Sequence, residues 1–296
     1  MNYYGGIEAG GTKFICMIGH DPEHILSEFM IPTKSPDLTI PEVIRFFKEG
    51  EITFGIKLSS IGIATFGPLN LSVNDPGFGT ITSTPKTQWQ NTPLYQIVKG
   101  HFNIPVQIDT DVNGAAIGEG KWGAGIGFRD FVYITIGTGI GGGIISCGKP
   151  IHGLTHPEIG HMLLHHDPKR DPFLGICPFH KDCLEGMASG PSMTERWGIS
   201  TYEMEPSHPA WDLEAHYLAQ AIHNLCLICS PQRIILGGGV MKNSELLQKI
   251  RKNVQISLKG YIDAPLINDH IDEFIVPPLL GDRAGVLGAI ALASQA

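Results

Sequence analysis

Four side chains between residues 161 and 183 have the chemical types and the number that a tetrahedral zinc ion requires. His161 precedes the cluster Cys177–x2–His180–x2–Cys183, so the segment offers two imidazoles and two thiols. Closed structural zinc sites use four ligands of this kind. We therefore expect a loop that a bound metal ion holds in place.

A carboxylate flanks each end of this segment. Glu158 lies three residues before His161, and residues at that spacing share a face on a helical turn. Glu185 follows the last cysteine by two residues. We expect the metal loop to hold these polar side chains at a binding site.

Two glycine-rich turns offer backbone amides and a threonine hydroxyl to a phosphate group. GIEAGGTKFICMIG and YITIGTGIGGGIIS share the order strand, turn, strand, which indicates a duplicated half. The second turn runs into a strand, whereas a Rossmann glycine loop must open a helix, and no P-loop pattern occurs. Amide nests bind phosphate without a helix terminus, although either turn alone is also consistent with a plain tight hairpin. The candidate nucleotide-binding residues here are Gly10, Gly11, Thr12, Lys13, Gly137, Thr138 and Gly139.

A third glycine segment follows an apolar run and precedes a helical pattern. A flat nucleotide base could lie against its bare backbone. Its residues are Gly237, Gly238 and Gly239.

The elements that must position these groups alternate between strands and helices, which indicates an α/β architecture. Apolar residues recur at helical spacing from Leu213 to Ile228, and Thr39-Ile-Pro-Glu42 has the form of a capping box that would begin a helix ending near Gly50. A further helix is expected from Asn243 or Ser244, and a last one from Asp282. The expected strands are Tyr4–Glu8, Phe14–Ile18, Ile61–Phe66, Val106–Asp109, Phe131–Ile136, Gly142–Ser146 and Arg233–Leu236.

Composition excludes several classes of protein. The net charge of −8, with 21 Lys and Arg and no basic run, argues against a nucleic-acid-binding surface. No apolar stretch approaches the roughly 20 residues that span a bilayer, and the N-terminal segment has no secretory signal pattern. Six cysteines without such a signal are expected to be thiols or metal ligands. We expect a cytoplasmic protein of about two domains.

Seven segments, taken in order, resemble the ROK family (repressors, open reading frames and kinases), and most of all its bacterial fructokinases. They are GGIEAGGTK, DVNGAAIGE, TIGTGIGGGI, PEIGH, the Cys/His cluster, LGGG and AGVLGAIALA, and FGTITSTPKTQW is similar to the fructokinase branch rather than to the glucokinases. The resemblance implies an actin-like, ribonuclease-H-like two-domain sugar kinase fold with a cleft between the domains. It places residues 1–115 with 282–296 in the first domain and residues 116–281 in the second.

The same resemblance implies roles for individual residues. Asp111, which by position alone is equally consistent with a helix N-cap, would be the general base that takes the proton of the sugar hydroxyl. The two phosphate turns would bind Mg²⁺-ATP, the third glycine segment would bind adenosine, and a structural Zn²⁺ would be held by the Cys/His cluster. The implied product is fructose 6-phosphate, and the implied assembly is a homodimer. The sugar-binding residues would be Asn113, Glu158, His161 and Glu185.

Two positions depart from the family pattern. His180 stands where the family loop carries a third cysteine, and imidazole is an equally good zinc ligand. Glu8 stands where the actin-like fold usually has aspartate, so its contact with Mg²⁺ is either direct or through water. Lys86 lies in the rigid Thr84-Pro85-Lys86 turn and has no assigned role. Lys13 either contacts phosphate or is a solvated hairpin lysine.

The remaining histidines and cysteines are expected to be structural. His152, His156, His165 and His166 are interpreted as surface residues or residues behind the site, and Cys226 and Cys229 as buried thiols on a helix face. Three rival functions remain open: a broader hexokinase acting on mannose or glucose, a sugar-sensing repressor and a non-catalytic zinc-stabilised binding protein. A repressor would need a DNA-binding module before the first strand, and only a few residues precede Glu8.

Overall fold

The computed structural model describes all 296 residues, and these form two compact units. The first comprises Met1–Gly127, Gly143–Pro157 and Leu279–Ala296, and the second comprises Phe128–Gly142 and Glu158–Pro278. In the first unit, the whole of α3 (Asp111–Trp122) packs against β4 and α10, and the chain enters the second unit after Gly127.

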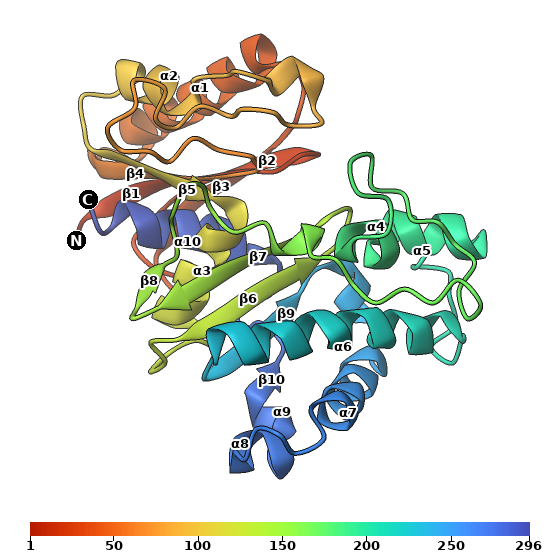
Figure 1. Cartoon of the computed structure of the whole chain (residues 1–296). Helices are drawn as coiled ribbons and strands as arrows, with labels where there is room; N and C mark the ends of the chain where they lie inside the picture. Colours follow the sequence, from red (N-terminus) through yellow and green to blue (C-terminus); the bar gives the residue numbers. More distant parts are fainter. The chain divides into compact units, whose positions relative to one another are not determined.

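The first unit is built on a five-stranded mixed sheet with the order β3-β2-β1-β4-β5. Figure 1 shows α1 (Pro36–Phe54) and α2 (Leu94–His101) on one face of this sheet, and α3 and α10 (Ala284–Ala293) on the other. Its core includes Ile7, Phe14, Phe47 and Trp89. The strands are β1 (Tyr3–Ala9), β2 (Lys13–Gly19), β3 (Ile25–Pro32), β4 (Leu58–Thr65) and β5 (Val106–Thr110).

The register of this sheet determines which residues share an edge. Strands β1, β4 and β5 are parallel, with Ala9 opposite Thr65 and Thr65 opposite Thr110. The carboxyl ends of parallel strands meet at one edge, where open α/β sheets bind their ligands. The first glycine turn and the start of α3 therefore leave the sheet at the same edge.

The second unit contains most of a second five-stranded sheet, with the order β10-β9-β6-β7-β8. Its long helix α6 (Ala210–Cys229) packs along α7 (Leu246–Leu258) (Figure 1). The strands are β6 (Phe131–Ile136), β7 (Ile140–Ser146), β8 (Lys149–Pro150), β9 (Arg233–Gly237) and β10 (Ile275–Val276). The shorter helices are α4 (Leu184–Ala188), α5 (Gly190–Trp197), α8 (Pro265–Asn268) and α9 (Ile271–Phe274), with 3₁₀ turns η1 (Thr87–Trp89), η2 (Ile159–His161), η3 (Gly239–Lys242) and η4 (Gly281–Arg283).

The expected start and end of the first helix were wrong. Helix α1 begins one turn earlier, with Ser35 as N-cap and Pro36 in its first turn, and it ends at Gly55, which adopts the left-handed conformation. Thr39 does not cap the helix, because its hydroxyl accepts a hydrogen bond from the Lys34 amide, 3.0 Å away. Proline suits the first helical position because its ring fixes φ near the helical value. Its missing amide hydrogen is no loss there, since that hydrogen would have no partner within the helix.

None of the helices combines the length and the apolar character needed to cross a bilayer.

Candidate functional site

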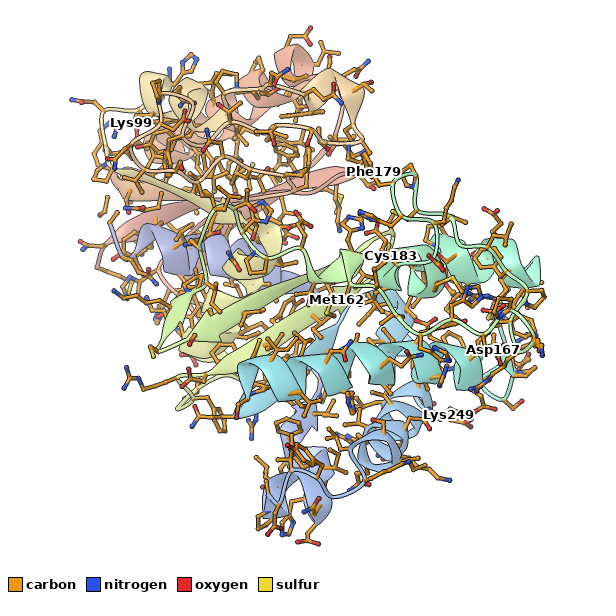
Figure 2. The ribbon with its side chains drawn as sticks, viewed as in Figure 1. Lys99, Met162, Asp167, Phe179, Cys183 and Lys249 are labelled. Carbon is orange, nitrogen blue, oxygen red and sulfur yellow. The ribbon has the colours of Figure 1, made fainter.

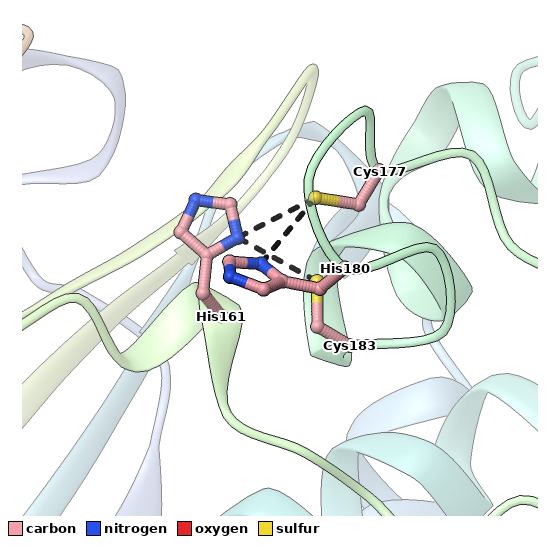
Figure 3. A group of neighbouring side chains, drawn as sticks. All are labelled: His161, Cys177, His180 and Cys183. Carbon is pink, nitrogen blue, oxygen red and sulfur yellow. Dashed lines mark hydrogen bonds between the residues drawn. The ribbon is translucent and has the colours of Figure 1, made fainter. Parts of the chain in front are cut away.

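The four predicted metal ligands come together in the second unit. Their ligand atoms all lie within 4.8 Å of one another. The His161 Nδ1 atom lies 3.7 Å from the Cys177 Sγ atom and 3.5 Å from the Cys183 Sγ atom, and the His180 Nδ1 atom lies 3.7 Å from the Cys177 Sγ atom (Figure 3). A tetrahedral zinc ion bound at about 2.3 Å from sulfur and about 2.0 Å from nitrogen would separate these atoms by about 3.6 Å. The cluster therefore fits a zinc ion in both donor type and spacing.

Local backbone structure shapes this cluster. The Cys177 and Lys181 amides each donate to the other residue's carbonyl, and Lys181 adopts a positive φ of 60°, which closes the turn that carries His180. Leu184 donates its amide to the Met162 carbonyl, and Figure 2 shows Met162 beside Cys183. Both cysteines are buried. The segment after His161 is thus joined to the cysteine loop by a backbone hydrogen bond, which helps to hold the four side chains together.

Glu185 connects the cysteine loop to the second glycine turn. Its Oε2 atom accepts a hydrogen bond of 2.9 Å from the Ile140 amide. A β-carbon on Gly139 would lie 2.7 Å from the same oxygen. Glycine at 139 therefore leaves room for the carboxylate against the turn.

The turn that carries Glu158 packs against the start of β7, the strand that begins at Ile140. Glu158 precedes η2, its side chain is exposed, and its carbonyl accepts a hydrogen bond from the His161 amide. A β-carbon on Gly160 would lie 1.8 Å from the Ile140 carbonyl oxygen, so only glycine permits this approach. The turn that carries Glu158, the Glu185 carboxylate and the second glycine turn thus all lie at the start of β7.

The third glycine segment packs against the end of β6. Gly238 has a φ of 94°, and a β-carbon there would lie 2.2 Å from the Ile136 carbonyl oxygen. The Tyr202 hydroxyl lies 3.2 Å from the position of a β-carbon on Gly239, although the Tyr202 side chain is 83% exposed. The structure therefore adds an exposed aromatic ring that the sequence did not indicate beside the predicted adenosine segment.

In the first unit, Glu8 lies beside the first glycine turn and against α10. A β-carbon on Gly285 would lie 2.4 Å from the Glu8 carboxyl carbon, and the Val286 amide donates to this carboxylate. The Glu8 Oε2 atom is buried without a hydrogen-bond partner. Burial, followed by the negative charge of Asp111, raises the pKa of Glu8 to about 7, although Lys13 and the Val286 amide oppose the shift.

Asp111 is the first residue of α3 and does not cap it. The N-cap is Thr110, whose hydroxyl accepts from the Asn113 amide, so the N-cap alternative for Asp111 is wrong. The Asp111 Oδ1 atom accepts a hydrogen bond of 2.9 Å from the Val112 amide. Burial raises the pKa of Asp111, against the lowering effects of backbone hydrogen bonds and of His156. A carboxylate with this raised pKa is better matched to accepting a proton near neutral pH.

Asp109 does more than end a strand. Its Oδ1 atom accepts a hydrogen bond of 2.8 Å from the Asn113 side-chain amide, and its Oδ2 atom lies 3.0 Å from the His152 Nε2 atom. The hydrogen bond and charge of Asp109 raise the pKa of His152 despite partial burial. Asp109 therefore holds the predicted sugar-binding amide in place, and no local sequence pattern indicated this.

Of the two positions expected for His156, at the surface or behind the site, the structure supports the second, because its imidazole interacts electrostatically with Asp111. His156 is buried, and its Nε2 atom accepts a hydrogen bond of 3.1 Å from the Leu69 amide. Burial lowers the pKa of this imidazole. His156 thus anchors the loop that follows Gly67-Pro68 within the first unit.

Comparison with known proteins identifies the family. The family model described as "ROK family" matches residues 4–296. The chain belongs to the ROK family. The resemblance noted from the sequence segments is therefore confirmed over nearly the whole chain.

This ROK protein is similar over its full length to relatives named for sugar phosphorylation. It is 43% identical over 296 residues to a fructokinase of Zymomonas mobilis, covering 99% of this chain and 97% of that protein. A ROK family glucokinase from Streptomyces griseus, solved in complex with glucose and AMPPNP, is 25% identical, with a TM-score of 0.76 and full coverage of both chains. A ROK hexokinase from Thermus thermophilus has a TM-score of 0.79 at 24% identity, covering 99% of this chain and 98% of that one. The actin-like sugar kinase fold expected from the sequence is confirmed.

Proposed function

We propose that this ROK protein is a fructokinase, which transfers the terminal phosphoryl group of Mg²⁺-ATP to the 6-hydroxyl of fructose. The observation that carries this proposal is the 43% identity to a fructokinase over the full length of both chains. In the reaction, the bond between the γ-phosphorus and the bridging oxygen breaks, and a bond forms to the sugar oxygen. The hydroxyl proton is released to a base, and ADP leaves with its magnesium ion.

Asp111 is the proposed base. Its carboxylate lies at the start of α3, and its raised pKa brings it closer to the pH of the reaction. Such groups typically contribute about 10²–10⁴ in rate. Asn113, which Asp109 holds by a hydrogen bond, is proposed to bind the sugar next to this base.

The carboxylates of Glu158 and Glu185 are proposed to accept hydrogen bonds from sugar hydroxyls. Hydrogen bonds from hydroxyls to carboxylates are charge-assisted, which suits an uncharged ligand. His161 would contribute to the sugar site while its Nδ1 atom faces the metal cluster.

Phosphate and nucleotide recognition is assigned to the three glycine segments. The turns at Gly10–Lys13 and Gly137–Gly139 offer backbone amides for the phosphates, and Gly237–Gly239 would face the adenosine. Tyr202, exposed beside Gly239, is proposed to cover the base.

His161, Cys177, His180 and Cys183 are proposed to hold a structural zinc ion. Four protein ligands fill a tetrahedral site, so the ion would cross-link the loop and leave no open position for chemistry. The homodimer and the cytoplasmic location stay predictions.

The test is ADP production from Mg²⁺-ATP with fructose, mannose, glucose and N-acetylglucosamine, in wild type and in Asp111→Asn. The matched control is Asp37→Asn, because Asp37 is an exposed aspartate at the start of α1. We expect turnover to be highest with fructose and to fall by about 10²–10⁴ in Asp111→Asn alone. A preference for mannose or glucose would mean that the protein is a broader hexokinase and not a fructokinase. The absence of turnover with any sugar would refute the kinase proposal.

A further inference from the structure

Three exposed lysines surround the first glycine turn: Lys13 at its end, Lys34 after β3, and Lys86 in the loop before η1. None of the three forms an ion pair in this structure. Other lysines have partners, such as the exposed Lys57 with Glu51 and the half-buried Lys249 with Asp212. A group of unpaired cations beside backbone amides is an environment for an anion.

Lys34 and Lys86 line one pocket of about 310 Å³ in the first unit. Its other lining residues include Thr33 and Trp89, and no carboxylate lines it. The volume is at the lower end of the range for small-molecule sites. The pocket is therefore large enough for a small anionic group and offers it two cations and no carboxylate.

The wall of this pocket is bonded directly to the glycine turn. The Thr33 amide donates to the Thr12 carbonyl over 3.0 Å, and the Thr33 hydroxyl donates to the Gly10 carbonyl over 2.8 Å. Lys86 lies over the turn itself, because a β-carbon on Gly11 would be 2.6 Å from its Cε atom and 3.5 Å from its Nζ atom. Glycine at 11 therefore leaves room for the Lys86 side chain as well as exposing the backbone.

The backbone that carries the two lysines is rigidly held. Trp89 is 1% exposed, and its Nε1 atom donates to the Lys34 carbonyl over 2.7 Å. The buried Thr84 accepts from the Lys86 amide through its hydroxyl and from the Gln90 side chain through its carbonyl. A cation with its backbone ordered in advance loses less conformational entropy on binding.

We propose that Lys86 binds the terminal phosphoryl group of ATP at the first glycine turn and follows it during transfer. This inference rests on the kinase function proposed above. The ammonium group donates hydrogen bonds to non-bridging phosphoryl oxygens and exchanges no proton with them. Charge that spreads over these oxygens in the transition state is stabilised by a cation already in position. Lys34 lines the same pocket and contributes positive potential.

The test compares Lys86→Met and Lys86→Arg with Lys99→Met as the matched control. Lys99 is an exposed lysine of the same unit, on α2, and its ammonium lies 5.7 Å from the Tyr95 ring centre (Figure 2). We expect Lys86→Met to lower kcat by about 10²-fold, with the KM for fructose within about twofold of wild type and partial recovery in Lys86→Arg. The thermal melting temperature of each variant reports whether it folds.

Binding measurements separate the possible sources of the phosphate. We expect Lys86→Met to bind a non-hydrolysable ATP analogue about tenfold more weakly and ADP as well as wild type does, because only the analogue carries the terminal group. Equal losses for both nucleotides, or a raised fructose KM with unchanged kcat, would overturn the proposal. Loss of inorganic phosphate binding with normal kcat would make the pocket a separate effector site and would also overturn it. If wild type shows no turnover, the kinase function fails, and the comparison of ADP with the analogue still decides the role of Lys86.

Discussion

Glu8 provides a direct test of the electrostatics in the first unit. Its carboxylate lies against Gly285, accepts the Val286 amide, and has one buried oxygen without a hydrogen-bond partner. Burial and the charge of Asp111 raise the pKa of Glu8 from 4.5 to about 7. Glu8→Gln keeps the shape and the acceptor of this side chain and removes its charge.

The magnitude follows from the raised pKa. Below pH 4.5 the carboxyl is protonated in the folded and unfolded states, so it does not change stability with pH. As pH rises towards 7 the unfolded chain loses this proton before the folded chain does, and wild type is progressively destabilised. The full loss above pH 7 is about 3 kcal/mol, since each tenfold change in proton affinity corresponds to about 1.4 kcal/mol. Between pH 5 and pH 8 the loss amounts to about 2.5 kcal/mol.

The assay is urea unfolding of wild type and Glu8→Gln at pH 5 and pH 8. The stability of the variant relative to wild type should rise by about 2.5 kcal/mol between the two pH values. Any free-energy cost of burying the glutamine side-chain amide is the same at both pH values, so it cancels when the two relative stabilities are compared. Glu49→Gln, at an exposed position of α1, should show no such rise. A relative stability of Glu8→Gln that is equal at pH 5 and pH 8 would refute the reasoning. A loss of turnover in Glu8→Gln would show that the protein needs this carboxylate for activity, even though its charge lowers stability at pH 8.

Three further predictions concern the proposed zinc ion, the proposed base and the packing around the carboxylates proposed to bind the sugar. Chelation should remove about one zinc ion per chain and lower the melting temperature by several degrees. The variant Cys183→Ser should melt at this lowered temperature even without a chelator. An unchanged melting temperature in the metal-free protein would exclude the zinc site. The acid limb of the pH–rate profile should lie above the ordinary range of an aspartate, because burial raises the pKa of Asp111 and its protonated form cannot accept a proton; a rate independent of pH down to pH 4 would contradict this. Gly160→Ala should raise the fructose KM by at least about tenfold, because its β-carbon would lie 1.8 Å from the Ile140 carbonyl oxygen. The control Gly100→Ala, with open space around residue 100, should leave the KM unchanged. Equal KM values for the two variants would refute this prediction.

Some expectations from the sequence held because they depend on neighbouring residues. Cys177, His180 and Cys183 are close together in the sequence, and the structure brings their ligand atoms together with His161. Both glycine turns connect strands, as their β-branched flanks indicated. Strand β3 was missed, because it is an edge strand in which the consecutive residues Phe29 and Met30 point to opposite faces and are both exposed, so it lacks an alternating polar pattern.

The sequence by itself determined the family, the α/β class, the set of candidate metal ligands and the local character of each glycine segment, since these depend on residue type and short-range spacing. Only the tertiary structure decided which distant side chains meet. The Asp109–Asn113–His152 contacts, the burial of His156 and the position of Lys86 over Gly11 all join residues from separate elements. These contacts depend on strand register and on close packing, which no local pattern encodes.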